Sequence, residues 1–154
     1  MWLEEHLRHS HGYGVHSPLL YRIVREAMMP RHIKGEDTAL YEALRAKGVG
    51  RRTATRLQNL YSLEGYRAWH IDCVSKDHEM MIATIRCSDK QLRAMATVAS
   101  RQQGILCILT PLGNRARRRL CRELIGAHNS MSASKPTFTL LVWRTDLQKQ
   151  HINI

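Results

Sequence analysis

The segment Gly104-Ile-Leu-Cys-Ile-Leu-Thr110 constrains the fold more than any other part of the chain. Its five apolar residues run without interruption between Gly104 and Pro111, which is typical of a strand that is buried on both faces. Such a strand needs a neighbour on each side and a covering layer above and below. We therefore expect residues 104–110 to form the middle of a sheet.

Apolar residues at helical spacing lie on both sides of this segment and predict helices over 89–101 and 114–125. The expected buried positions are Leu92, Met95, Ala96 and Ala99 in the first helix and Ala116, Leu120, Leu124 and Ile125 in the second. The arginines of the second helix fall largely opposite its apolar stripe, on a face that is either simply solvated or able to follow a phosphate backbone.

Strand patterns occur at 66–73, 79–87, 136–145 and 147–154. Together with the central segment they predict an α/β fold with a partial, Rossmann-like mixed sheet of about five strands. The short connections predict antiparallel hairpins, one between 66–73 and 79–87 and one between the last two strands. Residues 126–136 are rich in serine and predict a polar loop.

Residues 1–65 predict a helical region, so the chain reads as one domain, 1–154, with the sheet in 66–154. Ser17 and Pro18 have the character of an N-cap and a first helical residue, and Pro30 ends that helix. The apolar positions that follow are Leu20, Ile23, Val24, Ala27 and Met28.

The chain carries 24 Lys and Arg against 13 Asp and Glu, a formal net charge of +11. This balance favours anionic partners, nucleic acid among them, or reflects no more than a basic soluble surface. The four cysteines lie far apart among apolar neighbours, which predicts free, buried thiols in a reducing compartment. No run of residues is apolar enough to span a bilayer, so we expect a cytoplasmic protein that does not bind membranes.

Two short helices about Gly48-Val49-Gly50 predict a hairpin over residues 40–61 that is similar to a helix-hairpin-helix. In that motif, glycines allow a nucleic-acid phosphate to approach backbone N–H groups at the turn and at the start of the second helix. The residues expected to contact nucleic acid are Lys47, Gly48, Gly50, Arg51, Arg52 and Arg56. A plain helical hairpin that packs on the sheet is the alternative interpretation.

The phrase His11-Gly-Tyr-Gly-Val-His-Ser-Pro18 resembles the N-terminal signature of a bacterial group of class I S-adenosylmethionine-dependent methyltransferases. The C-terminal segment Leu147-Gln-Lys-Gln-His-Ile-Asn-Ile154 resembles the closing strand of that group. The positions that match the signature are His11, Gly12, Gly14, His16, Ser17 and Pro18. This resemblance implies a methyltransferase sheet that ends in an antiparallel pair of strands.

The glycine-rich loop and the acidic strand end with which the family holds its cofactor are not recognisable in this sequence. We therefore expect a truncated, methyltransferase-like protein that acts as a non-catalytic binding or interaction module. A nucleic-acid-binding protein and an active methyltransferase with an atypical or partner-completed site are the alternatives. We expect no cofactor, or S-adenosylmethionine if activity is retained, and a homodimer formed through an exposed sheet edge.

The sequence contains no arrangement of side chains that is typical of a catalytic site. His70 and Asp72 fall on one face of the strand 66–73, as a general base with its orienting carboxylate or, more simply, as a surface pair. The histidines of residues 1–16 lack the regular spacing of a metal site. We therefore expect neither a catalytic residue nor a metal ligand.

Overall fold

The computed structural model describes residues 18–74, 76, 79–144 and 147–154. The fold is α/β, as the sequence predicts, and the chain divides into two compact units. One unit ends at Tyr66 and is helical, and the other comprises Arg67–Asn153 and contains the sheet. Each unit is described by itself below.

The helical unit begins with α2, Pro18–Ile23, which continues as a π-helix, η2, Val24–Met28. The apolar positions predicted from the sequence, Leu20, Ile23, Val24, Ala27 and Met28, are all buried. Helices α3, Ala39–Ala46, and α4, Arg51–Leu63, follow and pack on each other. The predicted N-cap Ser17 lies outside the described residues, and Pro18 is the first residue of α2.

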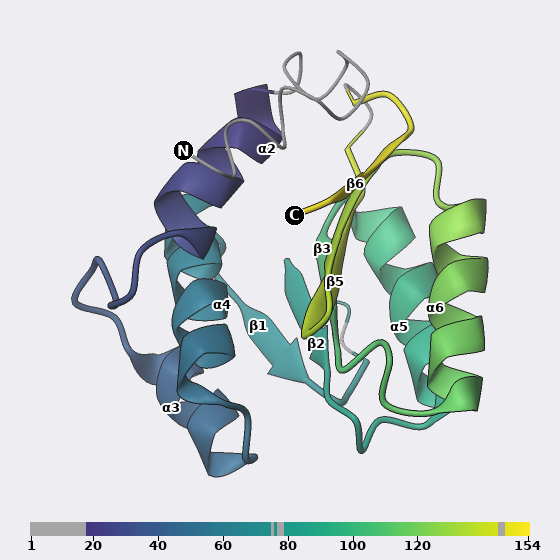
Figure 1. The fold of residues 1–154 in the computed structure, drawn as a ribbon, viewed down its shortest axis with the longest axis horizontal. Coiled ribbons are helices and arrows are strands. Elements are labelled where there is room, and N and C mark those ends of the chain that lie inside the picture. The colour runs from purple at the N-terminus through teal and green to yellow at the C-terminus, as the bar shows by residue number, and fades with distance from the viewer. Residues whose placement is uncertain (1–17, 75, 77–78, 145–146) are drawn as a thin grey trace. The chain divides into compact units, whose positions relative to one another are not determined.

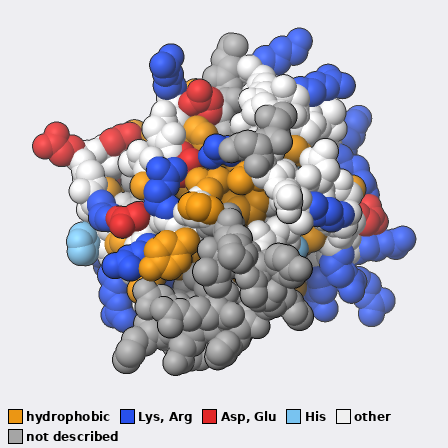
Figure 2. Space-filling model, turned by 90° about the horizontal axis from the view of Figure 1, so that it is seen from above, with side chains coloured by type: hydrophobic (Ala, Val, Ile, Leu, Met, Phe, Trp, Pro, Cys, Tyr) orange, Lys and Arg blue, Asp and Glu red, His pale blue; other side chains and the backbone are white. Residues whose placement is uncertain are grey.

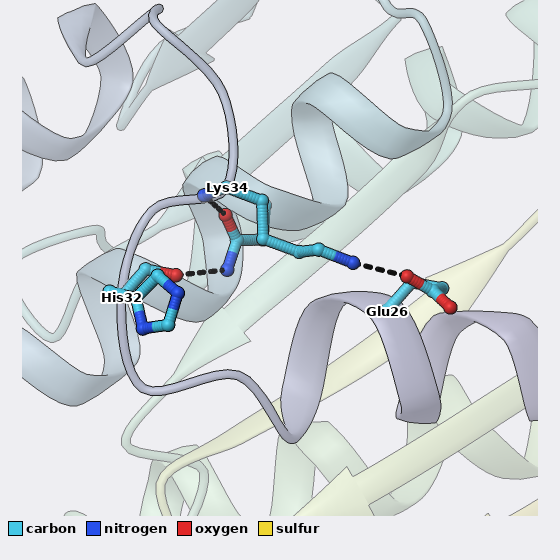
Figure 3. Close-up of polar contacts among 4 residues, drawn as sticks. Glu26, His32 and Lys34 are labelled. Carbon is cyan, nitrogen blue, oxygen red and sulfur yellow. Dashed lines mark hydrogen bonds and ion pairs between the residues drawn. The ribbon is translucent and has the colours of Figure 1, made fainter.

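Two buried amides on α4 fix the segments that precede it in the chain. The Asn59 amide accepts a hydrogen bond from the backbone N–H of Lys34 (3.0 Å) and donates one to the carbonyl of His32 (3.1 Å), and Lys34 also pairs with Glu26 (Figure 3). The Gln58 side chain accepts a hydrogen bond from the backbone N–H of Tyr41 (3.0 Å). Because buried amides need partners, these contacts specify how the 30–38 connection and α3 lie against α4.

The sheet unit contains six strands in its described residues, in the order β1-β2-β3-β5-β4-β6. The strands are β1, Trp69–Ile71; β2, Met80–Ala83; β3, Ile105–Leu109; β4, Met131–Lys135; β5, Phe138–Val142; and β6, Gln150–Asn153. The predicted central strand is confirmed, because β3 is buried along its whole length between β2 and β5. Only β5 runs against its neighbours, so the sheet of this unit is mixed.

Helices α5, Asp89–Gln102, and α6, Arg115–Ala127, lie side by side on one face of the sheet (Figure 1). The predicted apolar face of α5 is confirmed, and it packs with Met81, Leu106 and Leu141 of the sheet in one buried cluster. In α6 the prediction is wrong by one position: Ala116 is exposed, and Arg117, Leu120 and Cys121 are buried. No described helix is long and apolar enough to cross a membrane.

Strands β1 and β2 are parallel, so the predicted hairpin between 66–73 and 79–87 is wrong. The paired part of β1 is only three residues long, Trp69–Ile71. A strand this short rises about 10 Å, so the residues between Ile71 and Met80 can return to its starting end without a crossover helix. Turn length alone therefore did not determine the strand direction.

The C-terminal strands also pair differently from the prediction. Residues 131–135, inside the predicted polar loop 126–136, form β4, which makes the antiparallel hairpin with β5. Strand β6 pairs with β4 in parallel and not with β5. The serines of β4 find partners across the sheet, Ser132 with His151 of β6 (2.8 Å) and Ser134 with Thr139 of β5 (3.0 Å), which explains how so polar a segment is accommodated.

Candidate functional site

The turn between α3 and α4 is built by a Schellman motif that closes α3. The N–H of Gly48 donates to the carbonyl of Arg45 (3.0 Å), and the N–H of Val49 donates to the carbonyl of Leu44 (3.1 Å). Gly48 has φ +85°, a left-handed conformation that favours glycine. The two N–H groups that the helix-hairpin-helix interpretation offered to a phosphate at the turn itself are therefore already occupied.

The open backbone donors lie instead at the beginning of α4. Gly50 is the N-cap and has no side chain to cap the helix, and the first intrahelical bond runs from the N–H of Ala54 to the Gly50 carbonyl (2.9 Å). Helix geometry leaves the N–H groups of residues 51–53 without intrahelical acceptors. The first turn contains no acidic residue, so nothing in it neutralises the positive end of the helix dipole.

Basic and small exposed residues surround these donors. We call them the hairpin surface: Arg45, Lys47, Gly48, Gly50 and Arg51, all exposed. A Cβ added at Gly48 or Gly50 would meet nothing within 4 Å, so a ligand can approach the backbone there. Arg45 was not predicted from the sequence, and its guanidinium donates to the Val49 carbonyl (2.7 Å), four residues further along the chain.

Two of the predicted nucleic-acid residues have a structural task. Arg52 donates to the carbonyls of Pro30 (2.5 Å), Met29 (3.0 Å) and Met28 (3.2 Å), and Arg56 donates to the carbonyl of Met28 (3.0 Å). Both arginines thus cap the C-terminal end of η2, where carbonyls lack intrahelical partners. Burial, and then the charge of Arg52, lower the pKa of Arg56. Their charge remains near α4, but these donors already have acceptors.

The carboxyl ends of β1, β2 and β3 meet at one edge of the sheet, where open α/β sheets bind ligands. Asp72 has φ +58°, and its carboxylate accepts hydrogen bonds from the backbone N–H (2.6 Å) and the hydroxyl of Thr84. His70 contacts Cys73 instead (3.6 Å). Asp72 therefore joins the end of β1 to the end of β2, and these contacts give it a structural role.

The loops after β2 and β3 are in contact at the same edge. A Cβ added at Gly113 would lie 2.7 Å from Cδ1 of Ile85. Thr110, at the end of β3, has φ +48°, and its N–H donates to the carbonyl of Thr137 (2.9 Å). The Ile85 side chain thus fills the space next to Gly113 at this edge of the sheet.

Cysteine exposure differs from the prediction at one position. Cys87, Cys107 and Cys121 are buried and free, as expected, but Cys73 is exposed. Burial raises the pKa of Cys87 to about 11 and raises the pKa of Cys107 and Cys121. Among the described residues, no three His, Cys, Asp or Glu side chains come together to hold a metal ion.

The residues of the family phrase, His11, Gly12, Gly14, His16 and Ser17, lie outside the described residues, and so do the other histidines of residues 1–16. Comparisons with protein-family models, with curated proteins and with solved structures found no match to this chain.

Proposed function

We propose that this chain is a methyltransferase-like, non-catalytic module that binds nucleic acid through the hairpin surface. The observation that carries the proposal is the uncapped beginning of α4 at an exposed glycine turn, with Arg45, Lys47 and Arg51 around it. Backbone N–H groups and basic side chains at a helix N-terminus are the ordinary ligands of a phosphate. The net charge of +11 supplies a long-range attraction to the same partner.

The methyltransferase-like part of the proposal rests on the two terminal phrases and on the C-terminal strands. The segment 147–154 contains strand β6, and the antiparallel β4–β5 pair lies near the end of the chain. The resemblance implies a closing strand in 147–154, but it places the antiparallel pairing at that last strand, whereas β6 pairs in parallel with β4. Homodimerisation through an edge strand, β1 or β6, remains part of the proposal, because unpaired strand edges attract a second chain.

Binding of a fluorescently labelled 20-base-pair DNA duplex, followed by anisotropy at several salt concentrations, tests the hairpin surface. We expect Arg51→Glu to weaken binding about tenfold and to lower the slope of log Kd against log salt by about one. Arg22→Glu is the matched control, because Arg22 is an exposed arginine of the same unit and its partner Glu64 lies at the C-terminal end of α4, away from the hairpin surface. Equal effects of the two variants, or salt-independent binding, would contradict the proposal.

Thr53→Asp separates binding from folding. An acidic residue in the first turn of α4 interacts favourably with the helix dipole and with the open N–H groups, so this variant should unfold at a higher temperature. The same carboxylate repels a phosphate and competes for the same donors. We therefore expect weaker DNA binding by a more stable protein.

An active methyltransferase with a partner-completed site is the second proposal, and the shared carboxyl edge of β1, β2 and β3 favours it. Calorimetric titration with S-adenosylmethionine distinguishes the two. We expect no saturable heat, because the loops after β2 and β3 contact each other at that edge and the sequence has no recognisable glycine-rich loop. Micromolar binding, about −8 kcal/mol, would instead favour the enzyme.

A further inference from the structure

Helix α6 of the sheet unit displays a row of exposed arginines that folding does not explain. We call Arg115, Arg118, Arg119 and Arg122 the arginine stripe. Their spacing of three, four and seven residues places them on one face of the helix. Figure 2 shows Lys and Arg side chains gathered on the right, the side on which Figure 1 places α6.

The arginine stripe disfavours the helix that carries it. Like charges three and four residues apart repel each other, and a cation in the first turn opposes the helix dipole. The first turn of α6 contains no acidic residue. A sequence selected only for a stable solvated helix would alternate the two signs of charge along this face.

Within α6, little negative charge compensates the stripe. Glu123 is the one acidic residue in Arg115–Ala127, and it pairs with Arg93 of α5 at 2.8 Å and with Arg119 at 3.6 Å. The hydrogen bond and charge of Arg93, followed by the weaker effect of Arg119, lower the pKa of Glu123. Because α5 contributes another arginine to this carboxylate, one negative charge is shared between two cations.

The dimensions and composition of the stripe fit a phosphate backbone. Seven residues of helix extend about 10 Å, and phosphates of one duplex strand follow each other every 3.4 Å or so along the axis. The α6 sequence contains no aromatic residue that could stack on unpaired bases. A duplex, contacted without regard to sequence, is therefore a better partner than a single strand.

We propose that the arginine stripe is a second phosphate-binding surface, which contacts the backbone of a nucleic-acid duplex independently of the hairpin surface. This inference extends the proposed function, since it takes the same class of partner. It implies that the sheet unit binds nucleic acid as well as the helical unit. It also assigns α6 a role that the methyltransferase resemblance does not imply. Each arginine that neutralises a phosphate should contribute about one unit to the salt dependence.

The test is the duplex anisotropy titration with the full chain carrying Arg118→Gln and Arg122→Gln. We expect binding to weaken at least about tenfold and the salt slope to fall by about two. The control is Arg67→Gln with Lys76→Gln, which removes the same charge from exposed positions of the sheet unit outside α6. The α6 variant should also unfold at a slightly higher temperature, because repulsion within the helix is relieved.

The outcomes separate this inference from the proposed function. If Arg51→Glu weakens binding and the α6 variant binds the duplex as its control does, the proposal for the arginine stripe is wrong and the one for the hairpin surface is supported. If only the α6 variant weakens binding, the hairpin surface fails and the stripe stands. Tighter binding of poly-glutamate than of the duplex, with the same dependence on Arg118 and Arg122, would overturn the assignment to nucleic acid.

Discussion

Replacing Arg117 by alanine is expected to lower the free energy of unfolding by about 2–4 kcal/mol. Arg117 is 2% exposed, and its Nη2 donates to the carbonyls of Thr84 and Cys87 in the loop after β2. Alanine would leave the buried Cys87 carbonyl without its donor, at a cost of about 1–3 kcal/mol. The Thr84 carbonyl would lose a charged donor but keep the Cys87 N–H (3.1 Å), and the change would leave a space beneath α6. Urea denaturation followed by circular dichroism measures the loss.

Arg118→Ala is the matched control for Arg117, because the neighbouring arginine of the same helix is exposed. Its substitution should change the free energy of unfolding by no more than about 0.5 kcal/mol. Arg117→Met keeps most of the side-chain volume without the donors, and it should fall between the wild type and the alanine variant. Nη1 of Arg117 is buried without a hydrogen-bond partner among the described residues, so part of the desolvation cost is relieved in both variants. An alanine variant as stable as wild type would show that this relief outweighs the two lost hydrogen bonds.

Gly104→Ala should destabilise the sheet unit by about 1–3 kcal/mol. A Cβ at this position would lie 2.8 Å from the carbonyl oxygen of Glu79, and that oxygen is held as the acceptor of the Ile105 N–H (3.0 Å). The clash involves backbone on both sides and therefore displaces strand β3 from β2. Thermal and urea unfolding should both shift to milder conditions.

Gly126→Ala makes the same chemical change and should raise, not lower, the free energy of unfolding. Gly126 lies inside α6, and an added Cβ would meet nothing within 4 Å. Alanine loses less backbone entropy than glycine on entering a helix, so this variant should gain about 0.5–1 kcal/mol. Two alanine variants that shift stability in the same direction would refute the steric explanation for Gly104.

Much of the candidate site could be predicted from short stretches of sequence. Gly48 and Gly50 between two apolar periodicities indicate the α3–α4 turn, because glycine signals a left-handed helix end. The use of Arg52 and Arg56 as caps of η2 could not be predicted, since their acceptors lie more than 20 residues earlier in the chain. Periodicity shows which face of a helix a residue occupies, but it does not identify the partner that the fold brings to that face.

The sequence by itself determined the elements whose signals are local. The unbroken apolar run of β3, the buried face of α5 and the glycine-bounded hairpin each lie within a window of a few turns or one strand. Only the tertiary structure decided the parallel pairing of β1 with β2, the strand character of β4 and the burial of Arg117. The partner that decides the burial of Arg117 is distant in sequence: Thr84, which also holds Asp72. Strand β4 depends on its pairing with the nearby β5 and the more distant β6. A polar residue is buried only when the fold supplies such a partner. The residues next to it in the sequence do not indicate which partner that will be.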